Sequence, residues 1–220
     1  MKRTPIGERP LPNYTRSQEL ANMWTHIAGV LLGLALLPII ILKSRGPLAL
    51  FSGCLYAVSM ISLYSVSSVY HGLRPCMGKR VMRAVDHCTI YFLIAGTYSP
   101  ILLAAILPLY PGIAWGIFAA EWCLGLFAVV FTAVDLERFG KLSMCCYIGM
   151  GWLVVLALKP TLEALGTAGF LWLLWGGISY TLGAVIYGLG KKKPWLHTVF
   201  HVFVLLGSAL HAVCVLNYVF

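Results

Sequence analysis

Four side chains able to bind a metal or move a proton stand at the ends of apolar segments. His71 closes one segment, Asp86 opens the next, and His197 and His201 open the last. On a helix of 3.6 residues per turn, the four-residue spacing of His197 and His201 places both imidazoles about 40° apart, on one face. Ser67 stands at the same spacing before His71. Three histidines with a carboxylate or a water are typical of tetrahedral zinc.

Asp86 has two candidate roles in such a site. It is either a fourth zinc ligand or the group that holds a water in the open position of a catalytic centre. The alternative for the histidines is an interfacial position with the polar ring edge among lipid headgroups, which is the commoner case for a single histidine. Four such groups at the same end of the predicted helices strengthen the case for a metal, but the HxxxH spacing is a loose pattern, and spacing alone leaves both interpretations open.

A second polar line stands at the start of the first apolar segment. Glu19, Asn22 and His26 follow one another at positions i, i+3 and i+7, which places them within an arc of about 60° on a helix. They are candidates to line the entrance to the same cavity or to hydrogen-bond the outer nitrogens of metal ligands. Helix capping and hydrogen bonding between packed helices explain the same pattern equally well.

The elements that must position these residues are long and apolar. Of the 220 residues, 60% are hydrophobic and 10% are charged, whereas soluble domains have about 45–50% apolar and about 25% charged residues. This composition excludes a soluble globular protein and a disordered chain. The seven cysteines are odd in number, fall mostly inside apolar runs and contain no CxxC pair. They therefore do not indicate a secreted disulfide scaffold.

The apolar runs are near 20 residues long, the length at which a helix crosses the hydrocarbon core of a bilayer. They are about twice the length of a barrel strand and do not alternate, so helices are preferred. We predict an all-α membrane protein, a bundle of seven transmembrane helices. The predicted spans are 22–42, 49–71, 85–107, 113–134, 142–159, 168–189 and 196–218, joined by short loops such as 160–166. Residues 1–21 are expected to be a cytoplasmic segment without a signal peptide, and residues 22–220 the transmembrane domain.

The distribution of Lys and Arg predicts the orientation. Thirteen of them lie on the side of the amino terminus, and only Lys43, Arg45 and Lys159 lie on the other. Because basic residues near helix ends are retained in the cytoplasm, the amino terminus is predicted to be cytoplasmic and the carboxyl terminus outside. This orientation is opposite to that of G-protein-coupled receptors. The net charge of +9 is thus mainly an orientation signal in a multi-pass protein of a cell membrane, and no nucleic-acid partner is predicted.

Several of these motifs together resemble the bacterial hemolysin III family. This family belongs with the progestin and adipoQ receptors and, more distantly, with the alkaline ceramidases. The resemblance extends from Glu19 to the end of the chain. Its motifs are residues 19–26 (ELANMWTH), 67–71 (SSVYH), 86–100 (DHCTIYFLIAGTYSP), 150–153 (MGWL) and 197–201 (HTVFH), with His211.

The resemblance implies a seven-helix fold with a zinc site near the cytoplasmic leaflet. Carried over motif by motif, it implies His71, His197 and His201 as the zinc ligands. It further implies that Asp86 holds the water and that Ser67 stands beside the site. The chain has no counterpart of the long amino-terminal domain of the eukaryotic receptors, so binding of an adiponectin-type hormone is not implied.

Three functions compete on these observations. The first is a zinc-dependent hydrolase of a lipid amide or ester, with Asp86 as general base and Ser67 steadying the developing oxyanion. The second is a receptor-like or membrane-homeostasis protein in which zinc is structural and a membrane lipid or lipid-derived ligand shifts the bundle. The third is a pore-forming hemolysin, although seven permanent spans do not resemble a secreted toxin. His211 is interpreted as an interior hydrogen-bonding residue, and Glu121 has no predicted role.

Overall fold

A computed structural model describes residues 3–190 and 193–220 of the chain, and these residues are helical with no strand among them. The α-helices are α1 (Arg16–Lys43), α2 (Pro47–Gly72), α3 (Met77–Pro100), α4 (Pro111–Val134), α5 (Gly140–Gly151), α6 (Leu158–Leu189) and α7 (Trp195–Cys214). Short 3-10 or π-helical turns are η1 (Ile6–Glu8), η2 (Ile101–Ile106), η3 (Leu153–Ala157) and η5 (Val215–Val219).

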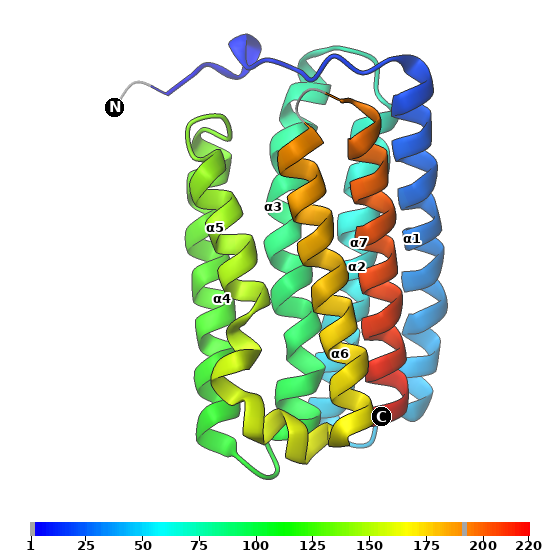
Figure 1. Cartoon of the computed structure of the whole chain (residues 1–220), viewed down its shortest axis with the longest axis vertical. Helices are drawn as coiled ribbons and strands as arrows, with labels where there is room; N and C mark the ends of the chain where they lie inside the picture. Colours follow the sequence, from blue (N-terminus) through cyan, green and yellow to red (C-terminus); the bar gives the residue numbers. More distant parts are fainter. Residues whose placement is uncertain (1–2, 191–192) are drawn as a thin grey trace.

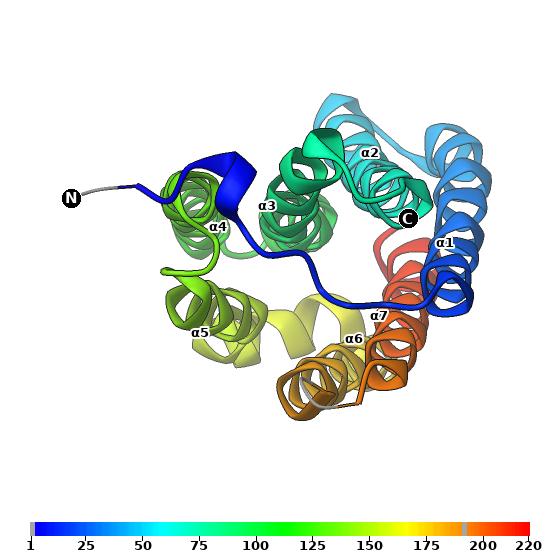
Figure 2. The same ribbon diagram turned by 90° about the horizontal axis from the view of Figure 1, so that it is seen from above.

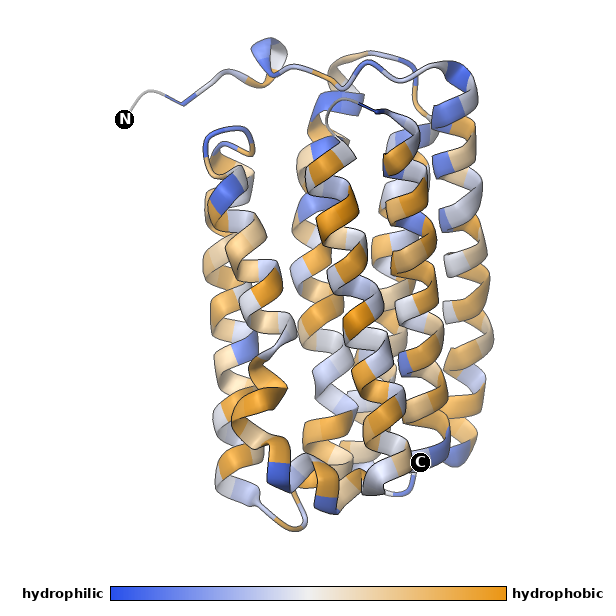
Figure 3. Ribbon diagram, in the orientation of Figure 1, coloured by the Kyte–Doolittle hydropathy of each residue, from blue (hydrophilic) through white to orange (hydrophobic). Residues whose placement is uncertain are grey.

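The helices stand side by side along one axis, with the two chain ends at opposite ends of the bundle (Figure 1). Seen from above, they form a ring in which α7 packs against both α6 and α1 (Figure 2). Apolar residues cover the length of the helices and polar residues gather at the two ends (Figure 3). Large side chains on the outer surface are apolar, such as Leu42, which is 86% exposed. Such a surface suits contact with lipid rather than with water.

Within residues 3–190 and 193–220, six helical stretches are long and apolar enough to cross a membrane. One of them, Gly140–Leu189, contains α5, η3 and α6, and Figure 1 shows that α5 and α6 run in opposite directions. The prediction of an all-α protein with several membrane-spanning helices is therefore confirmed.

Helices α1 and α3 begin well before the predicted spans because local capping extends them into polar sequence. Helix α1 starts at Arg16, where Thr15 and Gln18 form a capping box. This cap brings Glu19 into the first turn. Helix α3 starts at Met77, and its cap is the Cys76 side chain, which accepts a hydrogen bond from the Lys79 amide.

The predicted loop at 160–166 is wrong. Residues 160–165 are helical and belong to α6, which begins at Leu158. Pro160 lies in the first turn, where backbone amides have no partner within the helix, so the missing N–H of proline is tolerated. Gly166 adopts the non-helical angles φ 66° and ψ 171°, so residues 158–165 and 167–189 are two helical stretches that meet at a kink. The proline and glycine that predict a loop thus mark a helix start and a kink.

Candidate metal centre

Three of the predicted histidines meet at one end of the bundle. His71 lies in the last turn of α2, and His197 and His201 lie near the start of α7. One nitrogen from each ring lies within 4.8 Å of the others. His71 and His201 are buried, and His197 is half-buried. Helices α2 and α7 both pack against α1, and this arrangement brings together three imidazoles that can hold a metal ion.

His71 is oriented by an acidic side chain on α1. Its Nδ1 lies 2.7 Å from Oε2 of Glu19. A carboxylate only accepts, so Nδ1–H donates and Nε2 keeps its lone pair. That Nε2 is buried and has no hydrogen-bond partner among the residues that the structure describes. A carboxylate behind a histidine in this way fixes the tautomer that binds metal.

His201 is oriented by the backbone of helix α1, which also carries Glu19. Its Nδ1 lies 3.3 Å from the carbonyl oxygen of Asn22, to which it donates. The Asn22 side chain is held in turn by Thr198, whose hydroxyl donates to Oδ1 at 2.6 Å. The Nε2 atom of His201 therefore points away from α1, and it faces Nε2 of His197 at 3.1 Å.

The arrangement of these nitrogens suits a tetrahedral metal ion. Nitrogens bonded to zinc at about 2.0–2.1 Å lie about 3.3 Å apart, close to the 3.1 Å between the Nε2 atoms of His197 and His201. The unpartnered Nε2 of His71 supplies the third donor. Three neutral imidazoles suit zinc and other late first-row metals, so the residues present fit the predicted centre.

Asp86 and Ser67 line the same cavity as His197 and His201. Asp86 is half-buried and lies outside the group of three close nitrogens. Its position agrees better with the role of holding a water than with direct ligation. The Ser67 hydroxyl is buried beside the Asp86 carboxyl group, with which it interacts.

His26 forms a wall of the centre. Its ring stacks on His201 with the centroids 3.8 Å apart and meets Tyr64 edge-on at 5.0 Å. Both of its ring nitrogens are buried and have no partner in residues 3–190 and 193–220. Of the second polar line, Glu19 and Asn22 thus hydrogen-bond the histidine group, whereas His26 packs against it.

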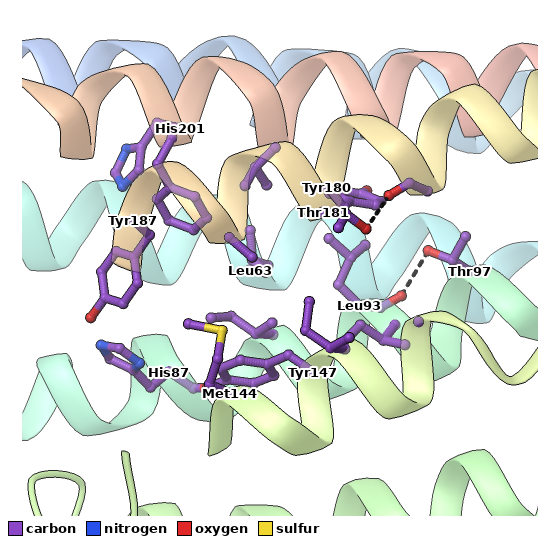
Figure 4. A pocket seen from close by; sticks show the side chains of 18 of the residues that line it. Leu63, His87, Leu93, Thr97, Met144, Tyr147, Tyr180, Thr181, Tyr187 and His201 are labelled. Carbon is purple, nitrogen blue, oxygen red and sulfur yellow. Dashed lines mark hydrogen bonds between the residues drawn. The ribbon is translucent and has the colours of Figure 1, made fainter. Parts of the chain in front are cut away.

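A narrow cavity of about 150 Å³ runs from the histidine centre into the bundle. It is lined by α2, α3, α5, α6 and α7, and most of its wall is apolar. Figure 4 shows His201, Tyr187 and His87 at one end, Tyr180, Thr181 and Thr97 at the other, and Leu63 and Met144 between them. The metal centre therefore opens onto an apolar channel inside the bundle.

The amino-terminal segment (residues 3–15) passes over the end of the bundle that holds the histidines (Figure 2). Its Tyr14 ring stacks on His197 with the centroids 5.2 Å apart and the planes 16° apart. Burial is the main cause that raises the pKa of the Tyr14 hydroxyl, and the nearby Tyr187 raises it further. This hydroxyl therefore stays neutral at ordinary pH. The far end of the segment is held at α4, where the Thr4 amide donates to Asp135 at 3.1 Å.

Two residues of the centre were missed by the sequence prediction. Lys79 is buried, and its Nζ lies 2.6 Å from Oε1 of Glu19 and 2.9 Å from the Leu73 carbonyl oxygen. In the sequence Lys79 is one of the basic residues of an orientation signal, and nothing distinguishes it from its neighbours. Tyr14 lies in a polar segment before the first helix, where no periodic pattern indicates a contact.

Comparison with known proteins gives consistent similarities. The sequence profile of a family described as "Haemolysin-III related" matches residues 14–212. The chain is 40% identical over 205 residues to "Hemolysin-3" of Bacillus cereus, covering 92% of each chain. It is 39% identical over 208 residues to "Hemolysin-3 homolog" of Bacillus subtilis (strain 168), covering 93% of this chain and 96% of the relative. It is 28% identical over 232 residues to "Monocyte to macrophage differentiation factor" of Homo sapiens, covering 99% of this chain and 90% of the relative. The matched region contains all three histidines.

Proposed function

We propose a zinc-dependent function for this chain, which belongs to the haemolysin-III-related family and is a multi-pass cell-membrane protein. In this proposal His71, His197 and His201 hold zinc, and the zinc-loaded protein hydrolyses amide or ester bonds of membrane lipids. The observation that carries this proposal is the convergence of three imidazole nitrogens, two of them on rings oriented from behind by Glu19 and the Asn22 carbonyl.

The residues around the centre have complementary roles in this proposal. Zinc, when bound, supplies a Lewis acid that activates water and polarises a carbonyl. Asp86 orients the attacking water and accepts its proton as general base. The hydroxyl of Ser67 donates to the oxygen on which negative charge develops. Glu19 and Asn22 hold the histidine rings in place, and the metal affinity depends on them.

The shape of the cavity supports a lipid as the substrate or ligand. The cavity is apolar along its length and starts at the polar centre, so a scissile head group and an acyl chain each have a matching surface. Its volume of about 150 Å³ extends over about 15 Å of helix length.

We also propose that the chain crosses the membrane seven times with its amino-terminal end in the cytoplasm. The opposed directions of α5 and α6 and the opposite positions of the chain ends support the seven crossings. The excess of Lys and Arg on one side supports the orientation. In this topology the amino-terminal segment and the metal centre lie at the cytoplasmic leaflet.

Metal content and lipid hydrolysis, measured together on purified protein, test the proposal. Wild type is expected to contain about one zinc per chain and to cleave a ceramide-like amide, and His71→Ala is expected to lose both. His87→Ala is the matched control for zinc content, because His87 lines the same cavity outside the ligand group. Zinc-loaded protein that cleaves no member of a broad panel of lipid amides and esters contradicts the hydrolase.

Asp86→Asn separates the hydrolase from a receptor-like protein with structural zinc. In the hydrolase the variant keeps its zinc and loses turnover. In the alternative the variant also keeps zinc, but wild type has no turnover to lose, and a bound lipid shifts the bundle instead. The cover that Tyr14 places over His197 is the observation that favours this second function, because it limits access to the centre.

Membrane permeabilisation is a third candidate, and it rests on the name Hemolysin-3 that two relatives carry. Dye leakage from liposomes at a low protein-to-lipid ratio tests it. Leakage that persists in His71→Ala supports permeabilisation independent of the metal. Intact liposomes at the same ratio contradict it.

A further inference from the structure

One of the three histidines lacks the outer hydrogen bond that orients the other two. His71 is held by Glu19, and His201 is held by the Asn22 carbonyl. The Nδ1 atom of His197 is buried and has no hydrogen-bond partner within the part of the chain that the structure describes, while its Nε2 faces Nε2 of His201. The orientation of the His197 ring therefore depends on packing rather than on a hydrogen bond.

Tyr14 makes the most nearly parallel contact with this ring. The planes of Tyr14 and His197 lie 16° apart, with their centroids 5.2 Å apart. Tyr187 and Phe200 meet the same imidazole at 54° and 36°, with their centroids 5.7 Å away. Tyr14 also lies 6.3 Å from the ring of His71. The contact with His197 is made by the face of the Tyr14 ring, which phenylalanine also has.

Arginine side chains fasten the amino-terminal segment to the end of the bundle, where it crosses from α4 to the start of α1 (Figure 2). The side chain of Arg9, which is 4% exposed, donates to the carbonyl of Val134, the last residue of α4. From α3, the Arg80 side chain donates to the Arg9 carbonyl at 3.0 Å. Arg83 donates to the Pro10 carbonyl at 2.7 Å. These three arginines form a latch, and none of these hydrogen bonds involves a histidine.

The backbone on both sides of Tyr14 is restricted. Pro5, Pro10 and Pro12 precede it, and each proline fixes one φ angle. A chain restricted in this way loses less conformational entropy when it is held in place. Directly after Tyr14, Thr15 caps helix α1. The segment is therefore built to keep the Tyr14 ring in one position.

We propose that the amino-terminal segment is part of the metal centre and that Tyr14 is a positioning residue for His197. The stacked ring keeps Nε2 of the imidazole directed at the other histidines. It also covers the imidazole, so the segment controls how fast a metal ion enters and leaves. The latch of Arg9, Arg80 and Arg83 sets how often the segment lifts. This inference rests on the metal binding of the proposed function and not on lipid hydrolysis.

Positioning and covering have different effects on zinc binding. The free energy of an aromatic pair corresponds to about a two- to tenfold change in a binding constant. Tyr14→Ala should therefore raise the Kd for zinc by about two- to tenfold. The rate of zinc release should increase by a larger factor than Kd, because loss of the cover also speeds the entry of zinc.

Zinc competition and the rate of zinc release to a chelator, measured on purified full-length protein, test this role. Tyr14→Phe keeps the aromatic face and should match wild type in both measurements. Asn13→Ala is the matched control, because Asn13 is an exposed neighbour in the same segment, and it should also match wild type. An unchanged Kd and release rate in Tyr14→Ala overturn the proposal. So does a defect in Tyr14→Phe as large as that in Tyr14→Ala.

Arg9→Met tests the latch at a distance from the histidines. Methionine removes the hydrogen-bond donors of Arg9 and keeps an unbranched side chain, so the segment should lift more often and zinc release should be faster. Because the latch acts through the Tyr14 ring, the effects of Arg9→Met and Tyr14→Ala on the release rate should combine to less than their product. Fully independent effects, or no effect of Arg9→Met, contradict this latch.

Zinc-free protein gives an independent readout of the cover. Diethyl pyrocarbonate modifies neutral imidazoles, and mass spectrometry of peptides measures how fast His197 reacts. This histidine should react slowly in wild type and in Tyr14→Phe and several-fold faster in Tyr14→Ala, and equal rates in all three overturn the cover. A protein that binds zinc, shows these differences and cleaves no lipid supports the role of Tyr14 and refutes the hydrolase. A wild type that binds no zinc refutes both.

Discussion

Oε2 of Glu19 lies 2.7 Å from Nδ1 of His71, while Oε1 of the same carboxylate lies 2.6 Å from Nζ of Lys79. One buried carboxylate thus orients a histidine of the metal centre and pairs with a buried ammonium. The three residues come from the ends of α1, α2 and α3. The histidine centre and the packing of these helices therefore depend on the same side chain.

Glu19→Gln is expected to weaken zinc binding by about 10–100-fold, the usual effect of removing such an outer partner. It also leaves Lys79 without a counter-charge, so the free energy of unfolding falls by about 3–5 kcal/mol. The double variant Glu19→Gln with Lys79→Met removes the unpaired charge. It should regain most of the stability without regaining the zinc affinity. Competition titration with a chelator and thermal unfolding measure the two effects, and equal recovery of both contradicts separate roles.

The attachment of the amino-terminal segment is expected to depend on pH through Asp135. Its carboxylate accepts hydrogen bonds from the Thr4 amide at 3.1 Å and the Arg138 amide at 3.2 Å. The Thr4 hydrogen bond is the main cause that lowers the pKa of Asp135 below its ordinary value. The folded pKa lies below the unfolded one, so the stabilisation is complete above the unfolded pKa of about 3.9. It is lost as the pH falls through the lower, folded pKa.

Hydrogen exchange at the Thr4 amide, corrected for its intrinsic pH dependence, checks this expectation. Protection should be constant from neutral pH down to about 4 and should decrease below it. Asp135→Asn keeps a hydrogen-bond acceptor and cannot titrate. In this variant the protection of the Thr4 amide should therefore be lower than in wild type and independent of pH. A wild-type protection that increases as the pH falls contradicts the assigned role.

Glu121 is expected to lower the stability of the fold. It lies within α4 and is 0% exposed, and neither carboxyl oxygen has a hydrogen-bond partner among the residues described. Replacing an unsatisfied buried polar group by an apolar one of similar size removes its desolvation penalty. Glu121→Leu should therefore raise the free energy of unfolding by about 1–3 kcal/mol, and Glu121→Gln should change it little. Marked destabilisation of Glu121→Leu, but not of Glu121→Gln, would reveal a polar partner such as a bound ion.

Local sequence patterns predicted the helices and part of the centre. The four-residue spacing of His197 and His201 places both rings on one face of any helix. By contrast, the meeting of His71 with this pair depends on how α2 and α7 are placed around α1, and spacing within one helix carries no information about that placement. The common position of the three at one end of the predicted helices made them candidates for one site, and the family resemblance strengthened this prediction. Glu19 and Asn22 hydrogen-bond histidines of the group, and these contacts are also hydrogen bonds between packed helices, so they agree with both interpretations of the polar line.

The errors have a common physical origin in residues with more than one structural use. Pro160 and Gly166 suit a loop, a helix start or a kink, and hydropathy alone does not decide among these. Lys79 suits both an orientation signal and a buried ion pair, and the choice depends on a partner on another helix. Contacts between distant segments decided each case, including the position of Tyr14 over His197.

Zinc should raise the thermal stability of the protein through its three histidines. A ligand that binds only the folded state at about 100 times its Kd stabilises that state by about 2.7 kcal/mol. Wild type should therefore lose thermal stability when a chelator removes zinc and regain it when zinc is restored. His201→Ala should unfold at one temperature with or without zinc, because the centre has lost a ligand that helix α7 supplies. His87 lines the same cavity outside the ligand group. The thermal stability of His87→Gln should therefore respond to zinc as that of wild type does. A zinc response that persists in His201→Ala and vanishes in His87→Gln would place the metal elsewhere in the cavity.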